Sequence, residues 1–186
     1  MSGSVQSRCG RERSVVIALL VLAFVASSCS GDATCDTFIA LNPDFAGYRS
    51  WPSHYAGDAP LAGHPVGDRT VYINHLPPSG STTYPVGTIV VKEIANHAVP
   101  GTPYIELFAM VKRGCDYDRE GARGWEYFHL TLDTYGNPVI RTRGIDPTSG
   151  DIYETMGGTG CNSCHASTGR EAFDYVFTPF LSGDAG

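Results

Sequence analysis

Toward the end of the chain, two cysteines and a histidine stand in the order Cys161-Asn162-Ser163-Cys164-His165. Two thiols three positions apart can form thioether bonds with the two vinyl groups of a haem, and the adjacent imidazole can then ligate the iron. The C-x-x-C part also occurs in thioredoxin-like redox proteins, but no βαβ pattern surrounds it here. The motif therefore predicts covalent haem c, with its iron bound by His165.

The second axial position of the iron decides what such a haem does. No residue after His165 is Met or His, and Met156 precedes the motif too closely to swing easily to the other side. A sixth ligand would have to be a lysine, Met110, His54, His64, His75, His97 or His129. Each of these histidines is more often a surface or hydrogen-bonded residue than a ligand. The simplest interpretation is a five-coordinate iron with an open site, suited to gas binding or catalysis.

A lysine interrupts an otherwise apolar strand in the segment Thr88-Ile89-Val90-Val91-Lys92-Glu93-Ile94. Strand periodicity places Lys92 on the same face as Val90 and Ile94. A buried ammonium is costly, so a lysine in a core needs a partner or a reaction. From spacing alone, a solvated face or pairing with a nearby carboxylate is the favoured explanation of Lys92.

Five blocks of the chain, in order and at compatible spacing, resemble the cytochrome P-460 family, which is related to β-sheet cytochromes c-prime. The resemblance covers most of residues 69–178 and is carried by Tyr84–Glu93, Met110–Arg113, Gly124–Tyr127, Cys161–Ala166 and Asp174–Thr178. It implies a β-rich homodimer whose c-type haem is cross-linked to a lysine, and Lys92 matches that lysine. Such a bond would change the electronics and geometry of the macrocycle.

The resemblance also implies an activity. Its first reading is an enzyme that oxidises hydroxylamine, with nitric oxide as a related ligand or co-substrate and a soluble cytochrome as electron acceptor. The second is a non-catalytic cytochrome that binds nitric oxide or a similar gas. A third hypothesis, a simple electron-transfer cytochrome c, comes from the coordination argument and requires one of the sixth ligands named above. Lys92 favours the cross-linked, catalytic branch.

Oxidation of hydroxylamine releases protons, so a base is needed. The resemblance implies a distal carboxylate shortly after the haem motif, where Glu171 and Asp174 are the nearby acids; Glu171 does not fall at the family spacing. It also implies a basic residue in the distal pocket, for which Arg69 is the candidate. An arginine at the surface of an edge strand is an equally good reading of Arg69.

The N-terminus has the pattern of a secretory signal. Arg8, Arg11 and Arg13 precede an apolar run over residues 15–26, which is too short to span a bilayer comfortably. Ser27-Ser28-Cys29 follows and is similar to a lipobox, with Ala26 where Leu is usual. We predict an exported lipoprotein in the periplasm or on the outer surface, which touches the membrane only through a lipid on Cys29. Plain cleaved secretion and an uncleaved anchor are the alternatives.

The other cysteines and the charge complete the picture. Cys9 leaves with the signal, and Cys35 and Cys115 remain as an even pair that could form a disulfide in an oxidising compartment. The formal net charge is −6 at pH 7, and no basic patch is present in the sequence, which argues against nucleic-acid binding.

The fold class predicted is mainly β (α+β): an antiparallel sheet with a few short helices, against which the haem packs. Runs rich in β-branched and aromatic residues predict strands over 69–74, 88–94, 104–112, 125–132 and 139–143. Asn42-Pro43 opens a short helix toward Trp51, and residues 56–68 form a loop by composition. The predicted division is 1–28 signal peptide, 29–68 N-terminal segment with the helix and loop, and 69–180 haem domain.

Overall fold

The computed structural model describes residues 35–59, 66–96, 104–147, 160–167 and 169–177. All of these except Cys35 belong to one compact unit, Asp36–Gly186. The predicted signal peptide and the lipid site at Cys29 lie outside the described residues, as do Met156, His64 and His97.

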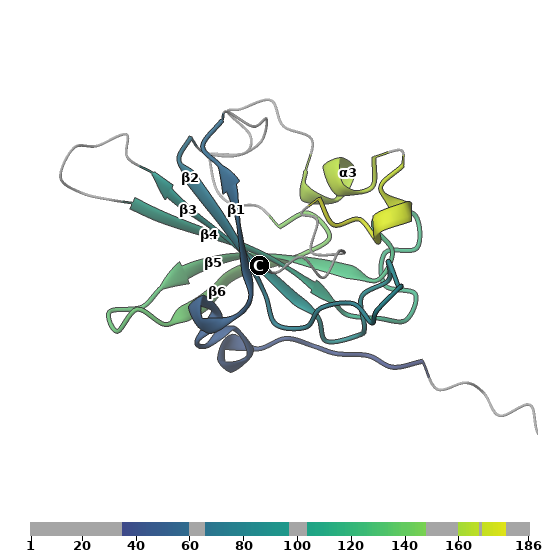
Figure 1. The fold of residues 1–186 in the computed structure, drawn as a ribbon. Coiled ribbons are helices and arrows are strands. Elements are labelled where there is room, and N and C mark those ends of the chain that lie inside the picture. Colours follow the sequence, from purple (N-terminus) through teal and green to yellow (C-terminus); the bar gives the residue numbers. More distant parts are fainter. Residues whose placement is uncertain (1–34, 60–65, 97–103, 148–159, 168, 178–186) are drawn as a thin grey trace, which may run out of the picture. The chain divides into compact units, whose positions relative to one another are not determined.

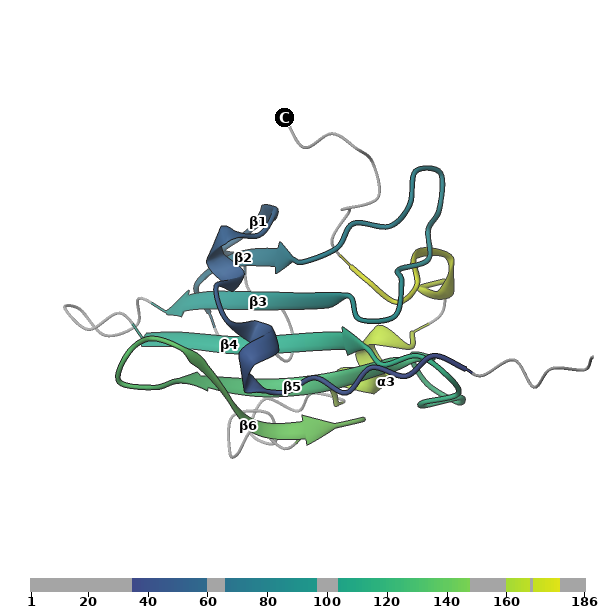
Figure 2. The same cartoon turned by 90° about the horizontal axis from the view of Figure 1, so that it is seen from below.

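Six antiparallel strands form one sheet in which each strand pairs with the next one along the chain (Figures 1 and 2). The strands are β1 (Ser53–Gly57), β2 (Asp68–Ile73), β3 (Ile89–Asn96), β4 (Tyr104–Lys112), β5 (Trp125–Leu132) and β6 (Pro138–Gly144). The predicted mainly β class, with an antiparallel sheet and a few short helices, is confirmed. The β-branched and aromatic runs that carried this prediction became β2 to β6. The central strands β3, β4 and β5 bury side chains on both faces, whereas β6 at the edge is only partly buried.

The first face of the sheet is covered by two 3-10 helices, η1 (Asn42–Phe45) and η2 (Tyr48–Ser50). Phe45 and Tyr48 pack here on a fully buried cluster contributed by β3, β4 and β5: Ile89, Val91, Leu107, Ala109, Val111, Phe128 and Leu130. In Figure 2 the two helices cross in front of the strands. Burial of each large apolar side chain in this layer stabilises the fold by about 1.5–3 kcal/mol.

The second face carries the C-terminal segment, which contains helix α3 (Cys161–His165) and the 3-10 helix η3 (Glu171–Phe173). Its buried cluster is Val71, Ile73, Tyr84, Val90, Met110, Ala122, Trp125, Tyr127 and Val176, against which Cys161, Ala166 and Tyr175 pack. Figure 1 shows α3 on the side of the sheet opposite the N-terminal helices. The C-x-x-C-H segment therefore lies against the second face, away from the buried cluster that the N-terminal helices cover.

The N-terminal part of the described chain differs from the sequence-based expectation. Instead of one helix toward Trp51, two 3-10 helices form, separated by Gly47 in the left-handed region with φ +68°. Strand β1 was missed, because its residues are exposed at the edge of the sheet and lack the alternation that burial imposes. Pro43 stands in the first turn of its helix, one place after the first helical position predicted for it, because the helix begins at Asn42 with Leu41 as its N-cap.

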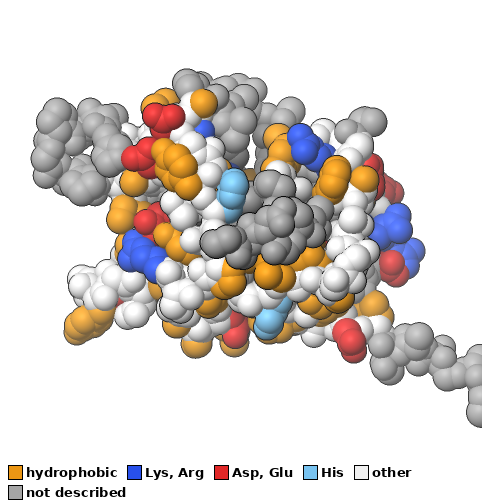
Figure 3. Space-filling model, viewed as in Figure 1, with side chains coloured by type: hydrophobic (Ala, Val, Ile, Leu, Met, Phe, Trp, Pro, Cys, Tyr) orange, Lys and Arg blue, Asp and Glu red, His pale blue; other side chains and the backbone are white. Residues whose placement is uncertain are grey.

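Charged side chains of both signs are scattered around the rim of the face seen in Figure 3, among hydrophobic ones. Within the described residues, no helix is long and apolar enough to cross a membrane.

Candidate functional site

Helix α3 presents the motif as a single helical turn. The Cys164 amide donates to the Gly160 carbonyl at 3.2 Å, and both Cys161 and Cys164 are free thiols. Residues three apart lie on one side of a helix, so the two sulfur atoms project in a similar direction. Cys161 is half-buried against the second face, and Cys164 is exposed.

Asn162, inside the motif, fastens this turn to the rest of the fold. Its side-chain Oδ1 accepts from the Ala122 backbone amide at 2.8 Å, and the backbone amide of Asn162 donates to Asp146 Oδ1 at 2.9 Å. The first variable position of the motif therefore contributes to position as well as spacing, since Asn162 links α3 to the segments before β5 and after β6.

His165 is held in one tautomer by a main-chain oxygen. Its Nδ1 lies 2.7 Å from the carbonyl oxygen of Tyr175, so Nδ1 carries the proton and Nε2 keeps its lone pair. Burial lowers the pKa of His165 to about 4, and the cations of Lys92 and Arg170 act in the same direction against the Tyr175 hydrogen bond. The ring packs against Tyr127 and edge-on against Phe177, at centroid distances of 5.3 and 4.7 Å. A neutral imidazole with a free Nε2 is the form that ligates iron.

Lys92 stands on the second face. Its cross-strand partners are Val71 and Phe108, and its Nζ lies 5.6 Å from the centre of the Phe108 ring. Burial lowers the pKa of Lys92 to about 8; attraction to Cys161 and Cys164 opposes this shift, and Arg69 adds to it. Lys92 in turn lowers the pKa of His165. The structure thus brings Lys92 into electrostatic range of both cysteines and the histidine of the motif.

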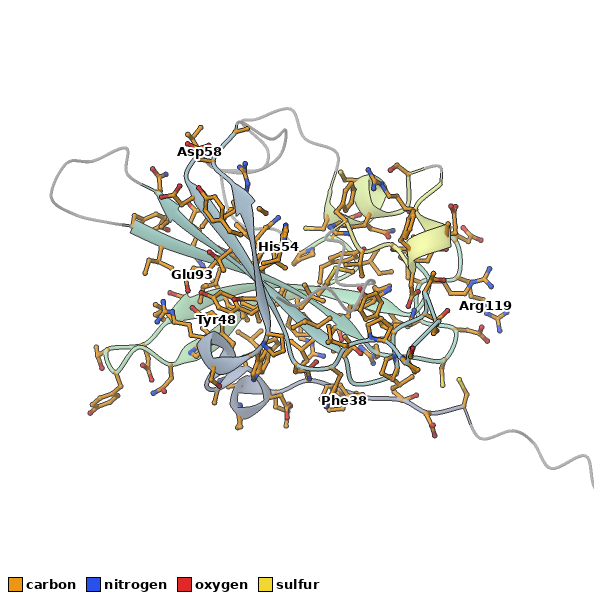
Figure 4. All side chains as sticks on the ribbon, viewed as in Figure 1. Phe38, Tyr48, His54, Asp58, Glu93 and Arg119 are labelled. Carbon is orange, nitrogen blue, oxygen red and sulfur yellow. The ribbon has the colours of Figure 1, made fainter. Side chains whose placement is uncertain are left out.

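The next residue confirms which way Lys92 points. Glu93 accepts hydrogen bonds from the Tyr48 hydroxyl and, at 2.8 Å, from Arg49 Nε, both in η2 on the first face. Figure 4 shows Tyr48 and Glu93 side by side next to the N-terminal helices. Because successive side chains of a strand alternate, Lys92 points to the face that carries α3.

Arg69, at the start of β2, is 4% exposed. Its Nη2 donates to the Ala59 carbonyl, whereas Nη1 is buried with no hydrogen-bond partner among the described residues. Arg69 pairs with Ile94, two positions beyond Lys92, and therefore shares the Lys92 face. The structure brings it together with the strand lysine and leaves one donor available to a further group.

The two acids after the motif have different surroundings. Glu171 is exposed in η3, where its Oε2 accepts from the Gly169 amide at 3.1 Å. Asp174 is buried and forms an ion pair with Lys112 of β4, with 2.5 Å between Oδ1 and Nζ. The structure places Glu171 on the surface and gives Asp174 an internal partner.

Sequence reasoning missed Glu106 on β4. Its cross-strand partner is Ile94, so it lies on the Lys92 face, and it is 4% exposed. Burial raises the pKa of its carboxyl, and Oε2 has no hydrogen-bond partner within the described chain. The signal was present: Glu106, Phe108 and Met110 alternate along one strand at the period that puts them on one face.

Two of the possible sixth ligands are buried on this face. His129 stacks on Phe108 with centroids 5.2 Å apart, and burial followed by the nearby Arg141 lowers its pKa. Met110 belongs to the cluster that contacts the motif helix. His54 on β1 pairs with Val71 but is exposed, and His75 is exposed in the connection after β2.

The described residues fit a c-type haem. They supply two free thiols on one helical turn, a neutral imidazole whose Nε2 keeps its lone pair, and buried polar atoms on the facing sheet that have no hydrogen-bond partner among the described residues. No group of three or more His, Cys, Asp or Glu side chains in the described part could hold a metal ion by itself. The porphyrin supplies four of the ligands of a haem iron, so the protein has to supply only one or two.

Cys35 and Cys115 are both disulfide-bonded. Thr37 forms an isolated β-bridge with Gly114, and its hydroxyl lies 3.1 Å from Cys115 Sγ. The pairing of Cys35 with Cys115 remains a prediction from sequence.

No family model matches this chain, and no curated protein or solved structure matches it either.

Proposed function

We propose that this chain is an exported c-type cytochrome that oxidises hydroxylamine at a haem modified by Lys92. The observation that supports it is the position of Lys92, which faces the C-x-x-C-H helix across the second face of the sheet and interacts electrostatically with its residues. A lysine at such a position is retained at a cost, because burial disfavours its charged form. A covalent role for the amine would explain that cost.

The two cysteines of the motif would have one task and its histidine another. Cys161 and Cys164 would attach the haem through thioethers, and His165 would bind its iron through Nε2 while Nδ1 donates to Tyr175. When bound, the haem would supply one-electron chemistry and an iron to which a small nitrogenous ligand can bind. Since burial brings the pKa of Lys92 to about 8, part of its amine is neutral near that pH and can act as a nucleophile. Its bond to the haem would replace one N–H of the amine and one C–H of the ring, and the two electrons released would leave to the same cytochrome acceptor as those of the substrate.

The proton acceptor in this proposal is Glu106. A general base for hydroxylamine should be a carboxylate held on the same face as the haem site, in surroundings that make its proton affinity high. Glu106 meets both conditions, whereas Glu171 is exposed. Arg69, with Nη1 unsatisfied beside Lys92, would bind the oxygen of the substrate or hold an ordered water.

The remaining elements of the proposal come from the sequence. The leader and Cys29 would place the protein outside the cytoplasm on a lipid anchor. Electrons would leave to a soluble cytochrome, and the molecule would be a homodimer, as the family resemblance implies.

The deciding experiment is production in a host with a c-type maturation system, followed by trypsin digestion and mass spectrometry. The proposal expects one peptide species that contains haem, Cys161, Cys164 and Lys92, a strongly red-shifted ferrous Soret band, and reduction of an added acceptor by hydroxylamine. Lys92→Arg is the matched variant and should show an ordinary c-type spectrum. Haem attached only at the two cysteines, with no acceptor reduction, would contradict the proposal.

A nitric oxide-binding cytochrome is the second candidate, and Phe108 favours it. The Phe108 ring lies against the Lys92 ammonium and stacks on His129. The part of the second face beside Lys92 is therefore apolar and suits a neutral diatomic ligand. Reversible binding of nitric oxide by a haem without the lysine bond would support this function. A low-spin six-coordinate spectrum unaffected by nitric oxide would instead indicate ligation by Met110 or His129 and simple electron transfer.

A further inference from the structure

The buried ion pair between Lys112 and Asp174 has no part in the proposed chemistry, but it connects the sheet to the histidine of the motif. We propose that Lys112 and Asp174 are positioning residues, which hold the Tyr175 carbonyl against His165 and thereby set the strength of the bond between His165 and iron. This inference rests on the proposed function only in taking His165 as the iron ligand.

Asp174 is fixed to the sheet from several directions. Its Oδ1 lies 2.5 Å from Lys112 Nζ and 3.4 Å from Trp125 Nε1, and its Oδ2 accepts from the Tyr84 amide at 3.0 Å. Lys112 Nζ also donates to the Arg123 carbonyl at 3.1 Å. Both side chains of the pair are almost fully enclosed, so the carboxylate has little freedom to move.

The backbone at this point adopts a conformation that it would not hold by itself. Asp174 and Tyr175 are consecutive non-glycine residues with φ of 48° and 66°, in the left-handed region. Such residues persist only where their surroundings enforce the conformation. The turn is held to the sheet by the side chain of Asp174, through its ion pair with Lys112 and its hydrogen bond to Tyr84, and by Val176, which is buried in the cluster of the second face. The ion pair is the charged part of this attachment.

The turn aims one carbonyl at the motif. The Tyr175 amide donates to Arg170 at 2.8 Å, and the Tyr175 carbonyl lies 2.7 Å from His165 Nδ1. When one nitrogen of an imidazole binds a metal, a hydrogen bond donated by the other nitrogen fixes the ring and raises its basicity toward the metal. An unbroken series of contacts thus runs from Lys112 through Asp174 and Tyr175 to His165.

The chain offers a matched control on the other face. Glu126 is a buried carboxylate bound by Arg113 at 3.1 Å and Arg143 at 2.8 Å, and it does not contact the motif. Loss of this ion pair should cost stability without changing His165. A merely structural role for Lys112 and Asp174 predicts that all three positions behave alike.

The test uses the holoprotein and the variants Asp174→Asn, Lys112→Met and Glu126→Gln. Resonance Raman spectroscopy of the ferrous state gives the iron–histidine stretching frequency, and redox titration gives the reduction potential. We expect a lower frequency and a more positive potential in Asp174→Asn and Lys112→Met, because the imidazole becomes a weaker donor. Glu126→Gln should leave both unchanged while lowering the melting temperature.

Asp174→Asn preserves shape, so it remains informative if Lys112→Met does not fold. Unchanged frequency and potential in folded, haem-loaded Asp174→Asn would overturn the inference, as would equal shifts in Glu126→Gln. A wild-type protein without thioether-bound haem would overturn both the inference and the proposed function. A haem protein that shows the shifts but does not oxidise hydroxylamine would overturn the proposed activity alone.

Discussion

Lys92 and Glu93 are adjacent in the chain but lie on opposite faces of the sheet. Glu93 binds Tyr48 and Arg49 on the face covered by the N-terminal helices, and Lys92 lies over Phe108 on the face that carries the motif. The register of β3 between β2 and β4 decides this assignment, since a shift by one residue would exchange the two side chains.

Replacement of Lys92 by methionine should stabilise the haem-free protein at pH 7. Burial lowers the pKa of Lys92 to about 8, whereas the unfolded chain keeps a value near 10.5. The unfolded state therefore binds the proton more tightly than the folded state does. The resulting loss of folding free energy is complete below pH 8 and disappears as the pH rises toward 10.5. The gain at pH 7 should be about 3 kcal/mol at most.

Urea denaturation of both proteins at pH 7 and at pH 10 measures this difference. Arg119→Met, at an exposed position, provides the control and should change neither value. An equal effect of Lys92→Met at both pH values would show that packing, not charge, is responsible.

Replacement of Glu106 by glutamine should stabilise the protein at neutral pH. Burial raises the pKa of Glu106 in the folded state, so the native protein binds its proton more tightly than the unfolded chain does. The cost of the charged form is present above the folded pKa and absent below the ordinary value near 4.5. Unfolding free energies at pH 7 and pH 4 should therefore differ in their response to the substitution.

Under the proposed function, the same Glu106→Gln variant should oxidise hydroxylamine roughly 10²–10⁴-fold more slowly, the usual effect of removing a general base. Glu171→Gln is the matched control, since its carboxylate is exposed, and it should retain the wild-type rate. Steady-state assays on haem-loaded samples distinguish the two. A large loss in Glu171→Gln with none in Glu106→Gln would return the role to the acid after the motif.

Asp174→Ala should be strongly destabilising. It leaves the Lys112 ammonium buried without its carboxylate and also removes the acceptors of Tyr84 and Trp125. Breaking a buried pair in this way typically costs about 3–5 kcal/mol, to be measured by urea denaturation. Asp116→Ala, which removes an exposed partner of Arg119, should show no measurable loss.

Cys35 and Cys115 should be found in one disulfide-linked peptide pair when the protein is digested without reduction. Both are disulfide-bonded, and the bridge of Thr37 with Gly114 lies beside Cys115. Replacement of both by alanine should lower the free energy of unfolding by about 4 kcal/mol, because a long loop of the unfolded chain is no longer closed. Two cysteines linked to other partners would contradict the pairing.

The sheet was predictable to a large extent. Strands β2 to β6 are long enough, and rich enough in β-branched and aromatic residues, for local pattern to determine them. β1 was not predictable, since Ser53–Gly57 is an exposed edge strand that pairs with β2 through its backbone and has no buried alternation. The short helices differed because Gly47 breaks the segment that Asn42-Pro43 begins.

By itself, the sequence determined the chemistry that depends on local spacing: two thiols and an imidazole in Cys161–His165, and a lysine placed at strand period in Thr88–Ile94. Only the tertiary structure decided which acids are buried and what they contact. Asp174 meets Lys112 from 62 positions away and the Tyr84 amide from 90, and Glu106 shares the Lys92 face through the pairing of β3 with β4. Such contacts depend on chain segments brought together by folding, so no local pattern of spacing or hydrophobicity contains them.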